Sequence, residues 1–81
     1  MRTHITYDPG DRVAVTATRE MGIAHDNEAG GTEFFDGGTR LECIVERTWN
    51  DPEIGRRYVG RTDEGQKIYF GEFGVELKPL Q

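Results

Sequence analysis

A cluster of aromatic and arginine side chains in the second half of the chain has the residue types that proteins use for recognition. Trp49 stands at the end of an alternating run, Arg57 follows it, and Tyr69 lies beyond the next turn. Tryptophan, tyrosine and arginine dominate binding hot spots, because each joins a large contact surface to hydrogen-bonding groups. In the alternative interpretation, the arginines stabilise neighbouring strands through cross-strand ion pairs with glutamates. The pattern therefore favours either a recognition face or a salt-bridged strand surface.

Covalent and metal chemistry have weaker support in the sequence. Cys43 is flanked by Ile44 and Val45 in a strand-like run, which predicts a buried thiol with a raised pKa and little reactivity. Residues 25–28 (His-Asp-Asn-Glu) supply nitrogen and oxygen donors, but they lack the ligand spacing of a calcium loop or a zinc site. We therefore predict no catalytic residue, no metal site and no cofactor, and a protein that is not an enzyme.

The second candidate surface is acidic. The formal net charge is -5, and residues 19–38 contribute -4 of it, from one arginine and five carboxylates. These carboxylates would steer a basic partner surface toward the segment, and its phenylalanines would anchor the contact. Equally, the segment fits a soluble loop whose phenylalanines cap the core. The predicted contact residues in this segment are three carboxylates and two phenylalanines: Glu28, Glu33, Asp36, Phe34 and Phe35.

Strands must position these side chains, and alternation predicts several of them. Two period-two runs flank residues 63–65, where Gly65 suits the left-handed conformation of a short hairpin turn. The same alternation predicts that Tyr58, Ile68 and Phe70 are core residues. Further short strands are predicted at residues 1–7, 12–18, 39–49 and 75–77, the third with its first half directed inward. Paired glycines predict that residues 19–38 form one long acidic loop, within which residues 32–36 resemble a short strand.

Composition places limits on the class of protein. Eighty-one residues with 35% hydrophobic content and 11 glycines predict one small domain over residues 1–81, built from short strands and tight turns. No apolar run approaches the ~20 residues that a membrane span needs. With one cysteine, no intrachain disulfide is available, which suits a reducing interior, so we expect a cytoplasmic protein without membrane partners. The net acidity disfavours nucleic acid as the first partner to consider.

Three segments together resemble the SH3-like barrel superfamily, which holds the SH3, Tudor and KOW-type modules. They are an opening turn and strand at residues 9–15 (PGDRVAV), the hairpin at 58–70, and a closing turn and strand at 73–77 (FGVEL). The resemblance implies an all-β fold, a small closed barrel of five to six short antiparallel strands with the long acidic loop at 19–38. It also implies a habit of binding other molecules, without naming a ligand.

The leading hypothesis is a non-enzymatic module that binds a protein with a basic surface and acts as an adaptor, regulator or inhibitor. Its predicted binding residues come from the acidic segment and the aromatic cluster: Glu28, Glu33, Phe34, Phe35, Asp36, Trp49, Arg57 and Tyr69. The alternative is a nucleic-acid-binding barrel that uses a local basic stripe: Arg47, Arg56, Arg57, Arg61 and Lys67. The sequence predicts no oligomeric state.

Overall fold

A computed structural model describes residues 6–80, which form seven antiparallel strands. The strands are β1 (Arg12–Ala17), β2 (Ile23–Asp26), β3 (Thr32–Phe34), β4 (Arg40–Asp51), β5 (Gly55–Thr62), β6 (Lys67–Gly71) and β7 (Val75–Pro79). The prediction of an all-β fold is confirmed. Within residues 6–80 there is no helix of the length and apolarity that crossing a membrane requires. Of the strand predicted at residues 1–7, positions 1–5 lie outside the described part, and Thr6 and Tyr7 are not in a strand.

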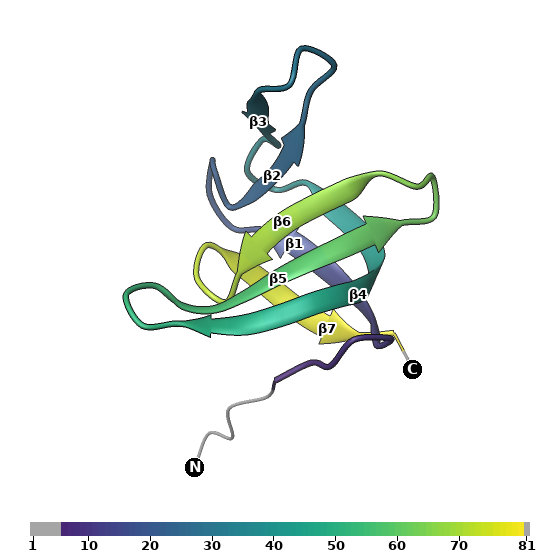
Figure 1. The fold of residues 1–81 in the computed structure, drawn as a ribbon, viewed down its shortest axis with the longest axis vertical. Helices are drawn as coiled ribbons and strands as arrows, with labels where there is room; N and C mark the ends of the chain where they lie inside the picture. Colours follow the sequence, from purple (N-terminus) through teal and green to yellow (C-terminus); the bar gives the residue numbers. More distant parts are fainter. Residues whose placement is uncertain (1–5, 81) are drawn as a thin grey trace.

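All seven strands belong to one sheet with the order β3-β2-β6-β5-β4-β1-β7. Figure 1 shows how strongly this sheet bends: β4, β5 and β6 lie in front, β1 and β7 lie behind them, and β2 and β3 project beyond β6. The prediction of a closed barrel with five to six strands is wrong. The physical reason is that β2 takes the free edge of β6, so the sheet continues into the β2–β3 hairpin and remains open between β3 and β7.

The core lies on the inner face of this bent sheet. The predicted core side chains of the central hairpin are confirmed, and the Tyr58 and Phe70 rings stack with their centroids 5.4 Å apart. Tyr7 completes this cluster, because its backbone N–H donates a hydrogen bond to the Tyr58 hydroxyl at 3.3 Å. The fully or nearly fully buried apolar side chains of this cluster are Tyr7, Val13, Val15, Ala17, Ile23, Cys43, Val45, Tyr58, Ile68 and Phe70.

A tight turn and a β-bulge shape the central strands. Gly65 has a φ of 85° and its N–H donates to the Thr62 carbonyl at 2.9 Å, which confirms the predicted tight turn between β5 and β6. A β-bulge in β4 shifts the register between Val45 and Arg47, so Glu46 is the extra residue. Because the bulge reverses the side-chain alternation, the first half of β4 faces the core and Arg47 and Trp49 lie on the opposite surface.

Candidate binding surface

A continuous cross-strand row of side chains covers the surface opposite the core. The register of the sheet places Arg47 opposite Val59, Val59 opposite Tyr69, Tyr69 opposite Ala24, and Ala24 opposite Phe34. The row therefore crosses β4, β5, β6, β2 and β3. Val59 is its floor, since only 6% of this residue is exposed although it faces away from the core.

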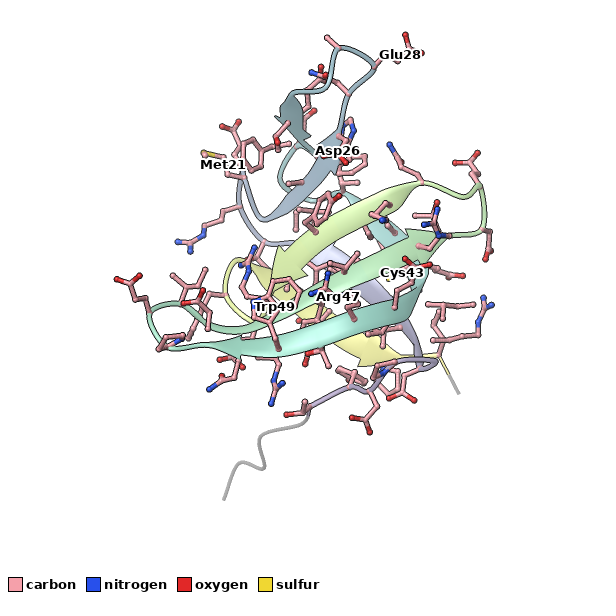
Figure 2. The ribbon with its side chains drawn as sticks, viewed as in Figure 1. Met21, Asp26, Glu28, Cys43, Arg47 and Trp49 are labelled. Carbon is pink, nitrogen blue, oxygen red and sulfur yellow. The ribbon has the colours of Figure 1, made fainter. Side chains whose placement is uncertain are left out.

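Trp49 and Arg57 form a second row directly beside the first. They lie opposite each other on β4 and β5, and Arg57 in turn lies opposite Gly71 on β6. A side-chain carbon at Gly71 would overlap the Arg57 guanidinium, so glycine at this position lets that group lie across β6. Figure 2 shows Arg47 and Trp49 side by side on the front of the sheet, and the Arg47 Cζ atom is 5.3 Å from the centre of the Trp49 ring.

We call the surface formed by the larger side chains of these two rows the Trp49 face. It is defined by six residues: Phe34, Arg47, Trp49, Arg57, Val59 and Tyr69. The face combines exposed aromatic rings with a buried floor, since 39% of Trp49 and 45% of Phe34 are exposed beside Val59. Residues of these types are enriched at binding hot spots. The face brings together four of the eight predicted protein-binding residues, namely Phe34, Trp49, Arg57 and Tyr69. Arg47, which the sequence placed in the alternative basic stripe, joins them through its contact with the Trp49 ring.

Ion pairing occupies one end of the predicted basic stripe. Arg61 donates from Nε to the Glu46 carboxylate at 2.7 Å and from Nη1 to the Gly65 carbonyl at 2.8 Å. The hydrogen bond between Arg61 and Glu46 lowers the pKa of Glu46 and raises the pKa of Arg61. Lys67 lies directly opposite Arg61 on β6. Arg56 has the opposite alternation from Arg57 on β5, so the five residues of the predicted stripe do not form one surface.

The segment predicted as a long acidic loop contains an ordered hairpin. Ile23 is fully buried and anchors β2 against the core, opposite Phe70. At the other end of the hairpin, the Asn27 side-chain oxygen accepts hydrogen bonds from the N–H groups of Ala29 and Gly31. The long-loop prediction is therefore wrong for residues 23–31, because a buried anchor and a side-chain-stabilised turn fix β2 and the turn after it. The short strand predicted at residues 32–36 is confirmed as β3.

A hydrogen bond fastens the hairpin to the Trp49 face. The Tyr69 hydroxyl on β6 donates to the Asp26 carboxylate on β2 at 2.9 Å, and this bond raises the pKa of Tyr69. Sequence reasoning missed Asp26, because only the pairing of β2 with β6 brings it near Tyr69. It also missed Val59 as the floor of the face, because the bulge that places Arg47 beside it leaves no mark in the hydrophobic pattern.

The predicted acidic contact residues lie apart from the Trp49 face. Glu28 is exposed at the tip of the β2–β3 hairpin (Figure 2), and Asp36 is exposed in the loop that follows β3. Glu33 alternates with Phe34 on β3 and accepts a hydrogen bond from the Asn27 side-chain amide at 3.1 Å. Phe35 is only partly exposed, because its ring packs against the core cluster with its centroid 4.6 Å from that of the His25 ring.

The thiol and the possible metal ligands singled out in the sequence were also located in the structure. Burial raises the pKa of the Cys43 thiol to about 11, which leaves it protonated and inert at neutral pH. His25, Asp26, Glu28 and Glu33 line an open hollow beside the hairpin. In the described part of the chain, no group of three or more histidine, cysteine or carboxylate side chains has an arrangement that could hold a metal ion.

Comparison with known proteins gives no relative from which a function could be transferred. No protein-family model, no curated protein and no solved structure matches this chain.

Proposed function

We propose that the protein is a non-enzymatic module that binds another protein through the Trp49 face and the acidic β2–β3 hairpin. The observation that carries this proposal is the half-exposed Trp49 ring, held by Arg47 on one side and lying opposite Arg57. A tryptophan whose surroundings are already packed loses little conformational freedom on binding, so its contact area contributes efficiently to affinity. Adaptor, regulator and inhibitor roles all follow from occupying a partner's surface.

The hairpin supplies the charge complementarity of the proposed interface. Residues 19–38 carry a net charge of -4, and the exposed Glu28, Glu33 and Asp36 extend this charge from the hairpin tip to the loop after β3. Such a charge accelerates association with a basic protein surface and does so most strongly at low salt. The partner is therefore a protein with a basic patch beside a pocket that accepts an aromatic side chain.

Affinity capture from the source cells tests this proposal with matched variants. The baits are the wild type, Trp49→Ala, and Ile54→Ala as a control, because Ile54 is also exposed (50%, against 39% for Trp49) but belongs to the β4–β5 turn and not to the two rows of the face. We expect one or more proteins to be retained by the wild type and by Ile54→Ala, and purified partner to bind Trp49→Ala about tenfold or more weakly. Equal affinity for all three baits would remove the Trp49 face from the proposal.

A charge-reversed hairpin tests the second part of the proposed interface. The variant combines Glu28→Lys, Glu33→Lys and Asp36→Lys, and it should slow association with the captured partner while changing dissociation much less. Surface plasmon resonance at low and high salt measures both rates. An association rate equal to that of the wild type at low salt would show that the hairpin does not steer the encounter.

Nucleic-acid binding is the second candidate, favoured by the position of Trp49 between Arg47 and Arg57, where a base could stack. Against it stand the paired Arg61 and the overall charge of -5. Titration of a labelled single-stranded oligonucleotide at low salt separates the candidates: salt-sensitive binding that Trp49→Ala abolishes would favour nucleic acid. The SH3-like resemblance and the cytoplasmic location remain predictions.

A further inference from the structure

The β3 edge of the sheet presents backbone hydrogen-bonding groups that no neighbouring strand uses. The N–H of Asn27 donates to the Gly31 carbonyl and the N–H of Phe35 donates to the Ile23 carbonyl, so residues 31 and 35 direct these groups toward β2. Along an antiparallel strand, the backbone N–H and C=O groups of successive residues point alternately toward and away from the neighbouring strand. Those of residue 33 therefore also point toward β2, and those of Thr32 and Phe34 point away from it. Within residues 6–80, β2 is the only strand paired with β3.

The β3 edge is short but accessible. Its three residues, Thr32, Glu33 and Phe34, are all exposed, and the strand contains no proline, lysine or bulge of the kind that protects many edges. Figure 1 shows β3 at the outer end of the hairpin, with no other segment beyond it. The two outward residues offer four backbone hydrogen bonds to an added strand.

The side chains of β3 define what such a strand would contain. Phe34 and Thr32 share the surface with the Trp49 face, and Phe34 is nearly half exposed, so residues placed opposite them would be apolar. Glu33 lies on the other surface, in a segment of net charge -4, so the residue placed opposite it would be basic. The matching pattern is apolar, basic, apolar.

We propose that the β3 edge binds an extended, basic segment of the partner protein by antiparallel strand addition. This inference rests on the proposed protein-binding function and specifies how part of the partner is held. Backbone hydrogen bonds to Thr32 and Phe34 give the added strand its register, and the charge of Glu33 selects a basic segment.

A second copy of the same chain fits this edge poorly. The fullest antiparallel overlap of two β3 strands pairs Thr32 with Phe34 of the other copy and places the two Glu33 side chains directly opposite each other. Like charges opposite each other destabilise strand pairing, and the two acidic hairpins would add further repulsion. The edge therefore rejects self-association and accepts a basic strand.

The test uses the labelled peptide acetyl-Lys-Val-Arg-Val-Lys-amide and measures its fluorescence anisotropy with the full chain. In the proposed register, the two valines exchange hydrogen bonds with Thr32 and Phe34, while the arginine N–H points away. We expect saturable, millimolar or tighter binding, weakened about tenfold when both valines are N-methylated and unchanged when only the arginine is N-methylated. A peptide with glutamate in place of the basic residues should not bind.

Two protein variants locate the binding on β3. Thr32→Pro removes one outward N–H without breaking the ladder to β2, because proline is tolerated at outward positions of edge strands. Thr32→Val keeps the N–H and serves as the control. We expect Thr32→Pro to bind the basic peptide several-fold more weakly than Thr32→Val, with circular dichroism showing the same fold for both.

The other outcomes overturn the proposal in distinguishable ways. Absence of binding up to about 5 mM peptide, or equal effects of the two N-methylation patterns, would exclude strand addition. If Trp49→Ala abolishes binding and Thr32→Pro does not, the proposed protein-binding function survives and the β3 mode fails. If sedimentation shows a wild-type dimer that Thr32→Pro dissociates, the occupant of the edge is a second copy.

Discussion

The two edges of the sheet are built differently. At β7, the hydrogen bonds from Thr18 N–H to the Gly74 carbonyl and from Leu80 N–H to the Arg12 carbonyl show that residues 75, 77 and 79 point outward. The last of these is Pro79, which has no N–H to donate, and the adjacent Lys78 is 73% exposed in its side chain. At β3, both outward residues keep their N–H groups and the only charge is Glu33.

This difference shows that exposure of an edge and availability of an edge are separate properties. Proline and lysine are recurrent means of preventing strand addition, and β7 carries both. β3 carries neither, so its selectivity comes from the sign of its charge. Under the proposal, the β7 edge excludes added strands in general, whereas the β3 edge excludes acidic strands, including that of a second copy, and accepts basic ones.

The largest predicted effect concerns the attachment of the β3 end to the core. Ile23→Ala should lower the free energy of unfolding by about 2–5 kcal/mol, because the fully buried side chain leaves a cavity between β2 and β6. Phe34→Ala, in the same hairpin but exposed, should change it by about 0.5 kcal/mol or less. Urea unfolding followed by circular dichroism measures both. Similar losses for the two variants would mean that Ile23 does not anchor the hairpin.

A smaller loss of stability is expected from a substitution at the contact between β4 and β5, in the middle of the sheet. A side-chain carbon at Gly60 would lie 2.6 Å from the Cys43 sulfur, so Gly60→Ala should destabilise the fold by about 1–3 kcal/mol. Cys43→Ala removes the sulfur, and adding Gly60→Ala to that variant should cost much less than it does in the wild type. Denaturant unfolding of the two single variants and the double variant gives the coupling energy. Additive losses would contradict the contact.

The buried Cys43 thiol also makes the free energy of unfolding depend on pH. Burial raises the pKa of folded Cys43 to about 11, above the ordinary value of 9.0, so the folded state keeps its proton while the unfolded chain releases it. The contribution to stability is complete below about pH 8.5 and is lost as the pH rises toward 11, on the order of 2 kcal/mol in total. Unfolding of the wild type and of Cys43→Ala between pH 8 and 11 measures it. A constant difference between the two would contradict the buried thiol.

The smallest effect is expected from substitutions that make the β7 edge resemble the β3 edge. Pro79→Val restores the missing outward N–H of β7, and Lys78→Glu makes that edge acidic. The double variant should gain weak binding of the basic peptide at β7, with stability changed by about 1 kcal/mol or less. Anisotropy titration in a Thr32→Pro background isolates this new site. Without any gain in binding, proline and lysine are not what closes the β7 edge.

Local chemistry made the central hairpin predictable from the sequence. Gly65 supplies the turn conformation, and the alternation around it identifies Tyr58, Ile68 and Phe70 as core residues without any long-range information. The residue types of the Trp49 face were likewise identified, since Trp49, Arg57 and Tyr69 are adjacent to this hairpin. Sequence reasoning succeeded wherever neighbours in the chain determine the structure.

Features that depend on pairing between distant segments were not predictable. The bulge at Glu46 follows from fitting β4 against β5, and it leaves no mark in composition. The β2 strand was missed because His25 and Asp26 interrupt its apolar pattern, and only pairing with β6 makes that segment a strand. The closed barrel was wrong for the same reason, because an edge is known only once every strand has found its partner.

The contrast between the two edges can be measured directly by nuclear magnetic resonance. Titration of the ¹⁵N-labelled chain with the basic peptide reports separately on the outward amides of β3 (Thr32, Phe34) and of β7 (Val75, Leu77). We predict saturable shifts and slowed hydrogen exchange at Thr32 and Phe34, with Val75 and Leu77 unchanged. Shifts at Val75 and Leu77, or at neither pair, would contradict the assignment of β3 as the strand-accepting edge.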